Sequence, residues 1–179
     1  SIFLTTNGIN AVFGGFEYSY HVVNTRGVVR QYFISMGVAM LLVVLILFSV
    51  IFWLAFEYIK GMRIFEFFEG NPYFFPLVKK IFFIFITYLS VSILFHFGSP
   101  QKGMRFFSAG SFLTLVLFIL TTYGFGIYIE NFAQYNQLYG SIGALLIFLL
   151  YIWLNATILL LGFELNASLM KLQLSSKSE

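Results

Sequence analysis

The chain has 179 residues, of which 60% are hydrophobic and 9% are charged, and its net charge is +3. A soluble domain carries about 25% charged residues and must cover its surface with polar groups, so this composition excludes a soluble globular fold. The absence of Cys and Asp, with only two His, also excludes a disulfide framework and a thiolate metal site. The positive charge is too dispersed for a nucleic-acid interface.

The first segment, about 5–23, has polar residues on one side of a helix, at Asn10, Gly14, Glu17 and His21. The apolar side holds Ile9, Val12, Phe13, Phe16, Tyr20 and Val23. This pattern predicts an amphipathic helix that is too polar to span a bilayer. Two readings are open: it lies on the membrane surface, or it packs against helices that precede this sequence. Because the chain opens on Ser1 with no leader pattern, we expect an N-terminal part of the full protein to be missing.

Four long apolar runs follow, at about 32–57, 77–97, 107–129 and 141–166. At about 1.5 Å per residue, each is long enough to cross the roughly 30 Å hydrocarbon core of a bilayer. The predicted fold class is therefore all-α: a polytopic transmembrane bundle of four spans plus the amphipathic helix, in one membrane domain. Thr87, Ser90 and Ser92 make the second span polar, and we expect its hydroxyls to hydrogen-bond across helices.

The connector between the first two spans, about 58–80, mixes aromatic and charged residues and contains the turn signal Gly70-Asn71-Pro72. It predicts a short interfacial helix followed by a turn. With four spans, both ends and the middle loop share one side of the membrane. That side would hold Arg26, Arg30, Lys102, Arg105, Lys171 and Lys177, against Lys60, Arg63, Lys79 and Lys80 on the other. The excess favours cytoplasmic ends.

The sequence contains few residues that could form a catalytic site. A metal-dependent hydrolase needs several His, Asp, Glu or Cys ligands that converge on one point. Here the two His and seven Glu are scattered, and no nucleophile–base pair or Gly-rich phosphate loop is present. We therefore expect no enzymatic activity, no cofactor and no metal site.

The last span carries the polar residues that are candidates for function: Asn155 near its middle, and Glu164 and Asn166 near its end. An amide within a span must face protein, water or substrate, because lipid offers it no hydrogen bond. Asn155 and Glu164 are nine residues apart and lie on opposite faces, whereas Asn155, Gly162 and Asn166 share one face. Glu164 has three readings: an ion-coupled group, a cation or headgroup ligand, or a structural partner of a neighbouring helix.

Small residues mark positions where helices can approach closely. Gly124 lies near the end of the third span, and Gly140 with Ala144 forms a small-xxx-small pair at the start of the fourth. Gly143 and Gly162 complete the predicted set of helix-packing positions.

Several of these residues also belong to a recognisable signature. The runs Tyr139-Gly140-Ser141-Ile142-Gly143-Ala144 and Leu160-Leu161-Gly162-Phe163-Glu164-Leu165-Asn166-Ala167, preceded by Tyr128, Asn131, Phe132 and Tyr135, resemble the C-terminal signature of the YihY/BrkB family of bacterial inner-membrane proteins. Upstream, Asn7-Gly8, Thr25-Arg26 and Pro100 fit the same pattern. The chain departs from it at Phe163, where the family usually has Ala.

The resemblance implies a protein of about six transmembrane helices with both ends cytoplasmic, of which roughly the first two would be missing here. The family once carried a ribonuclease label, now regarded as mistaken, and members have been proposed as transporters, including of lipids. The leading hypothesis is a transporter or lipid-translocating protein of the bacterial inner membrane, in which Asn155 lines the path and Glu164 with Asn166 forms a cytoplasmic gate. The alternative is a non-catalytic accessory subunit of a larger membrane complex, packed against other subunits or further copies of itself.

Overall fold

The structure, a computed structural model, describes residues 2–19, 26–60, 73–100, 104–132 and 136–175. All the regular structure in these ranges is helical, as the sequence predicted. The helices are α1 (Ile2–Glu17), α2 (Val28–Lys60), α4 (Phe74–Gly98), α5 (Ala109–Phe132) and α6 (Asn136–Ser175). The interfacial helix and turn predicted in the connector fall on residues 61–72, outside the described ranges.

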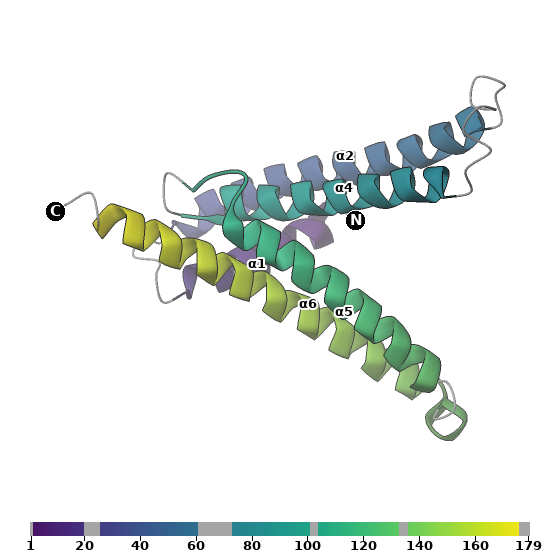
Figure 1. Ribbon diagram of the computed structural model, residues 1–179. Helices are drawn as coiled ribbons and strands as arrows, with labels where there is room; N and C mark the ends of the chain where they lie inside the picture. The colour runs from purple at the N-terminus through teal and green to yellow at the C-terminus, as the bar shows by residue number, and fades with distance from the viewer. Residues whose placement is uncertain (1, 20–25, 61–72, 101–103, 133–135, 176–179) are drawn as a thin grey trace.

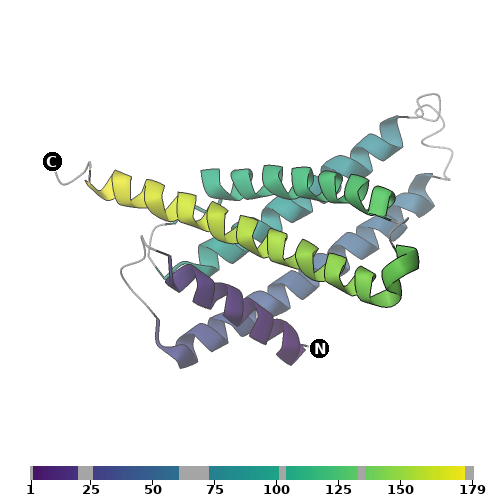
Figure 2. The ribbon, with the colours of Figure 1, turned by 90° about the horizontal axis from the view of Figure 1, so that it is seen from below.

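The four long helices form two hairpins, α2 with α4 and α5 with α6. Figure 1 shows the hairpins meeting where α4 leads into α5 and diverging toward their other ends, so that the molecule has the shape of a V. We call the meeting point the closed end and the other the open end. Turned by 90°, the molecule shows α1 lying across the closed end (Figure 2). Contacts of α1 with α2, α4 and α6 therefore tie the two hairpins together.

Four helices are long and apolar enough to cross a membrane: Val28–Tyr58, Phe74–Gly98, Ala109–Glu130 and Gly143–Gln173. Their outward side chains are largely apolar, as expected for surfaces that contact acyl chains. Examples are Val44 at 64% exposed, Leu120 at 60% and Leu146 at 61%. With 40 residues, α6 is about 60 Å long and therefore extends well beyond a roughly 30 Å hydrocarbon core.

Protein covers both stripes of α1. Ile9, Phe13 and Phe16 of its apolar stripe are buried, and so is Thr6. Its polar stripe faces α2, where the Gln31 amide, oriented to donate to Glu17 at 2.9 Å, also accepts the Gly14 N–H at 3.2 Å. The reading in which α1 buries its apolar stripe in the membrane surface is therefore wrong. The helix also ends earlier than predicted, at Glu17, and the rest of the predicted segment reaches residues 20–25, which lie outside the described ranges.

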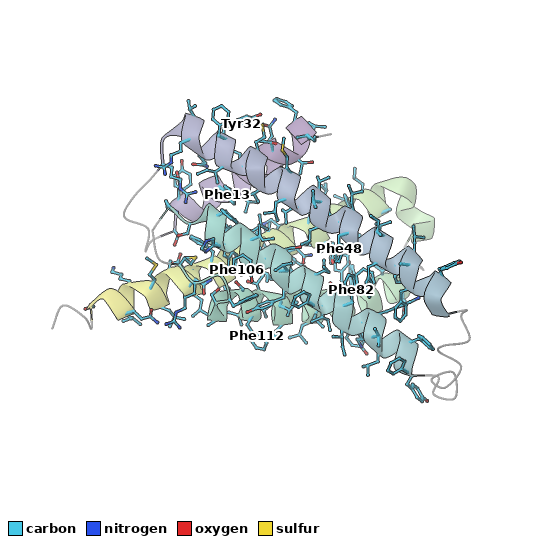
Figure 3. All side chains as sticks on the ribbon, turned by 90° about the horizontal axis from the view of Figure 1, so that it is seen from above. Phe13, Tyr32, Phe48, Phe82, Phe106 and Phe112 are labelled. Atoms are coloured by element: carbon cyan, nitrogen blue, oxygen red, sulfur yellow. The ribbon has the colours of Figure 1, made fainter. Side chains whose placement is uncertain are left out.

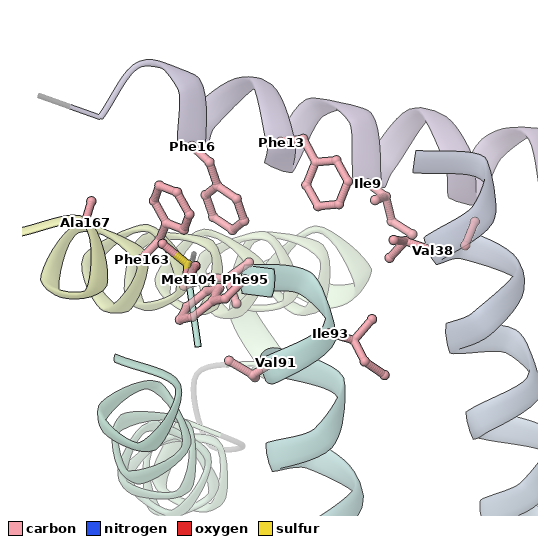
Figure 4. Close-up of a cluster of buried hydrophobic side chains, with 12 residues drawn as sticks. Ile9, Phe13, Phe16, Val38, Val91, Ile93, Phe95, Met104, Phe163 and Ala167 are labelled. Atoms are coloured by element: carbon pink, nitrogen blue, oxygen red, sulfur yellow. The ribbon is translucent and has the colours of Figure 1, made fainter. Parts of the chain in front are cut away.

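Aromatic rings fill the core of the closed end. Phe16 of α1 stacks on Phe163 of α6 with ring centroids 4.1 Å apart, and both rings meet Phe95 of α4 edge-on. Figure 4 shows these rings gathered between the three helices. The large ring at position 163, which departs from the family signature, thus packs against α1 and α4. Gly98 is required beside them, because a Cβ there would lie 2.7 Å from the Phe13 ring.

A separate aromatic contact holds the α2–α4 hairpin together toward the open end. Phe52 stacks on Phe82 at a centroid distance of 3.6 Å, and Phe48 lies 6.3 Å from the same ring (Figure 3). Nearby, Lys79 forms an ion pair with Glu57 at 2.6 Å and lies 4.0 Å above the ring of Trp53. The α2–α4 hairpin therefore has internal contacts of its own, away from the closed end.

The hydroxyls of the second span behave differently from the prediction. Thr87 donates to the carbonyl of Phe83 at 2.8 Å and Ser90 to that of Ile86 at 2.9 Å, both within α4. The hydroxyl of a helical Ser or Thr can donate to the carbonyl four residues earlier in the same helix. This bond satisfies the hydroxyl without a neighbouring helix. The expectation of bonds across helices is therefore wrong for these two residues.

Candidate functional site

Helices α5 and α6 approach each other closely near the closed end. Gly110 and Gly162 face each other so closely that a Cβ on Gly162 would overlap Thr114 and lie 2.9 Å from the Gly110 carbonyl oxygen. Only residues without a side chain permit this backbone contact. The sequence identified Gly162 as a packing position but did not identify its partner.

Asn166 lies one turn beyond Gly162 and clamps the start of α5. Its Oδ1 accepts the Gly110 N–H at 2.7 Å, and its Nδ2 donates to the Ser108 hydroxyl at 2.7 Å. The Ser108 hydroxyl also accepts the Ser111 N–H at 3.3 Å, as an N-cap residue does. The amide of Asn166 is 5% exposed and hydrogen-bonded at both ends. It therefore provides an acceptor for the Gly110 N–H, a donor at the start of α5 that would otherwise have no partner in a buried place.

Glu164 points away from this contact, toward α1. Its Oε2 accepts a hydrogen bond from the hydroxyl of Ser19, just after the end of α1. Gly162 and Asn166 thus share the face toward α5 while Glu164 lies on another face, as the helical phase predicted. The Glu164–Ser19 bond, like the stacking of Phe16 on Phe163, therefore links α6 to α1 or the residues just after it.

Asn155 lies on α6 three turns before Asn166. Its Nδ2 donates to the carbonyl of Tyr151 at 2.8 Å, within its own helix, and its side chain is partly buried. Among the described residues, its Oδ1 accepts no hydrogen bond. One acceptor in the middle of an apolar span therefore has spare capacity, which lipid cannot use.

The other predicted packing positions differ among themselves. Gly143 is buried, whereas Ala144 is exposed. Gly124 is also exposed, with no atom within 4 Å of where its Cβ would be. Gly140 lies in the part of α6 whose side chains fall outside the described set. Of the predicted positions, Gly162 is the one with a defined interhelical contact in the described structure.

Arg26 has a structural role that sequence reasoning missed, since it was used there only as a topological charge and as part of the family signature. Its guanidinium donates to the carbonyl of Phe97 at 2.7 Å and to that of Ser99, which caps the C-terminal end of α4. Its backbone N–H donates to Glu17 at 3.0 Å. Burial lowers the pKa of Arg26 below its usual value, Arg30 adds to this effect, and Glu17 opposes it. The contact is long-range, so no local pattern predicts it.

In the described ranges, no group of three or more His, Cys, Asp or Glu comes together that could hold a metal ion. His96 lies at the end of α4, and its Nδ1 is 3.0 Å from the carbonyl of Met104. The closed end therefore offers hydroxyls, amides, arginines and the carboxylates of Glu17 and Glu164, which can form hydrogen bonds and charge pairs.

Four apolar helices with small polar clusters at one end define a polytopic helical membrane protein. The chain belongs to the family described as virulence factor BrkB, whose match covers residues 1–178. This confirms the resemblance seen in the C-terminal signature.

Individual relatives carry only general names. The chain is 24% identical over 181 residues to the putative ribonuclease-like protein YfkH of Bacillus subtilis, covering 96% of this chain and 63% of that protein. It is 35% identical over 80 residues, 44% of this chain and 20% of the relative, to a UPF0761 membrane protein of Kangiella koreensis. A UPF0761 membrane protein of Xanthomonas campestris is 39% identical over 72 residues, 39% of this chain and 17% of the relative. The chain thus spans less than two thirds of the length of these relatives. No solved structure matches it.

Proposed function

We propose that this protein is a transporter, most specifically one that moves a lipid or other amphiphile across the bacterial inner membrane. The observation that carries the proposal is the V formed by two helical hairpins that meet at one end only. Each hairpin has its own internal aromatic or glycine contact, so tilting one against the other leaves both intact. Such rigid-body tilting about a fixed junction is a common basis of alternating access.

Three polar residues of α6 are the proposed path and gate. Asn155 lines the path, where its Oδ1 has capacity to accept a hydrogen bond from a passing polar group. Glu164 and Asn166 form the gate, since one is bonded to Ser19 beside α1 and the other to Gly110 of α5. Tilting of the α5–α6 hairpin against α1 would change the Glu164 bond to Ser19, whereas the Asn166 bond to Gly110 lies within the hairpin and keeps α5 and α6 moving together. The proposed gate works without catalysis, cofactor or metal.

The side of the membrane follows from charge. Among the described residues, the closed end carries Arg26, Arg30, Arg105 and Lys171. Cationic residues are concentrated on the cytoplasmic side of inner-membrane proteins. We therefore place the closed end in the cytoplasm and the open end at the outer face.

Flux through purified protein in liposomes tests the proposed path. The double variant Asn155→Leu with Glu164→Gln should lower the transfer of a fluorescent phospholipid analogue by about tenfold, because losing polar contacts worth about 1.4 kcal/mol slows a step by that factor. The matched control is Thr157→Val with Glu130→Gln, at exposed positions of α6 and α5. Wild-type flux in the first variant would refute the assignment of these residues.

The alternative function, an accessory subunit, is supported by the exposed Gly124 and the open space beside it. Gly126, two residues on, is similarly open, so α5 has small-residue positions without an interhelical contact in the described structure. Close helix approach at such residues is a common mode of association in membranes. In the same preparations, Gly124→Leu should then release a partner or a second copy, while the double variant above should be silent. A monomer in mild detergent, unaffected by Gly124→Leu, would contradict this alternative.

A further inference from the structure

A small pocket opens at the closed end, between the segment leading into α5 and the last turns of α6. Its volume is about 160 Å³, and Arg105, Ser108, Asn166 and Gln173 supply its polar lining. Pockets that take drug-sized ligands occupy about 300–1,000 Å³, and a water molecule in the liquid occupies about 30 Å³. The space therefore suits a group of a few heavy atoms and is too small for a whole lipid.

The charge in this pocket is positive and comes from a side chain. Arg105 is exposed and forms no ion pair within the part of the chain that the structure describes. None of the described residues that line it carries a carboxylate. The N-terminal N–H groups of α5 contribute little, because Asn166 and Ser108 already accept those of Gly110 and Ser111. The recognition expected here is that of the Arg105 guanidinium for an anion.

The remaining lining is apolar and reaches the surface. Phe107, Leu169 and Met170 border the same pocket, and Phe107 is 57% exposed and Leu169 37%. A free inorganic anion would gain nothing from these side chains. An anion attached to an acyl chain would use both parts of the site.

We propose that this pocket, defined by Arg105, Phe107, Ser108, Leu169 and Gln173, binds the phosphate headgroup of an anionic phospholipid. The acyl chains then lie along Phe107 and Leu169, toward the apolar surface of α5 and α6. Basic pockets between transmembrane helices on the cytoplasmic side are established as headgroup sites in other membrane proteins. The site deepens the proposed function, on which its role as the entry point for translocated lipid rests, but its binding can be measured without flux.

The test titrates purified protein in neutral detergent with short-chain phosphatidylglycerol, with phosphatidylcholine of the same chains, and with inorganic phosphate. Phosphatidylglycerol should bind more tightly than either of the others, as read by native mass spectrometry and by the shift in melting temperature. Arg105→Gln should weaken its binding by about fivefold, the factor expected for one arginine near an anionic headgroup. The matched control is Lys80→Gln, which removes an exposed cation near the start of α4, at the opposite end of the molecule.

A second variant guards against effects on folding. Ala109→Trp keeps Arg105 but fills the pocket from an exposed position, so it should also weaken phosphatidylglycerol binding. Equal binding of both lipids, an equal loss in Lys80→Gln, or full binding by Ala109→Trp would overturn the site. Competition by millimolar inorganic phosphate alone would show an anion site that does not recognise lipid. Preferential binding of phosphatidylglycerol without lipid flux would overturn the transport function but support the binding site. Lipid flux without preferential binding of phosphatidylglycerol would overturn the site but support the transport function.

Discussion

Replacing Gly162 with valine is expected to force α5 and α6 apart and to destabilise the protein by about 3 kcal/mol or more. Overpacking costs about 1–3 kcal/mol when side chains can adjust, and more when they cannot. Here the added atoms meet Thr114 and the backbone of Gly110, which cannot rotate away. The measurement is thermal unfolding in detergent, followed by the loss of helical circular dichroism and by exposure of a buried label.

The control for this prediction is Gly126→Val in α5. It adds the same atoms to a transmembrane helix at a position with no atom within 4 Å of the new Cβ. It should change the melting temperature little. A Gly162→Val protein as stable as Gly126→Val would show that the two helices do not touch at Gly110 and Gly162.

Asn166→Leu is expected to cost about 2–4 kcal/mol, although the leucine side chain has the same number and branching of heavy atoms as asparagine. The variant leaves the Gly110 N–H without an acceptor in a buried place and removes the bond to Ser108. A buried donor without a partner costs about 1–3 kcal/mol, and the second lost bond adds about 1 kcal/mol. Hydrogen exchange should speed up most in the first turn of α5, since that turn loses its cap.

The same substitution at an exposed position separates this effect from a general one. Asn7 lies exposed on α1, so Asn7→Leu should leave both the melting temperature and the exchange of α5 unchanged. Unaltered exchange in the first turn of α5 of Asn166→Leu would mean that Asn166 does not clamp that helix.

Much of the fold was predictable from sequence because it depends on local composition. A run of more than about 20 apolar residues has few alternatives to a membrane-spanning helix, and the four spans follow from that alone. The face shared by Gly162 and Asn166 followed from 3.6 residues per turn. The position of α1 was only half predicted. Its amphipathic pattern is plain, but the pattern does not say whether lipid or α2 covers each stripe.

The parts of the site that escaped prediction are all pairings between distant segments. Nothing local indicates that Gly110 is the partner of Gly162, since several glycines occur at similar positions in the spans. Arg26 caps α4 more than 70 residues away, and Glu164 reaches Ser19 across 145 residues. Such contacts depend on how the hairpins are arranged, which propensity and periodicity do not encode. Ser108 did carry a usable signal, because serine directly before a helical run is a preferred N-cap.

The V arrangement underlies the junction, the gate and the proposed tilting motion, and pairwise spin-label distances test it directly. The chain contains no cysteine, so labels can be introduced at chosen pairs. One pair, Phe97 with Leu161, spans α4 and α6 beside the Phe95–Phe163 contact, and the other, Leu77 with Leu145, spans the same helices toward the open end. In lipid nanodiscs, the Leu77–Leu145 distance should be much the longer and more broadly distributed of the two. Similar, narrow distances at both ends would show a parallel bundle and contradict the arrangement on which the proposed function depends.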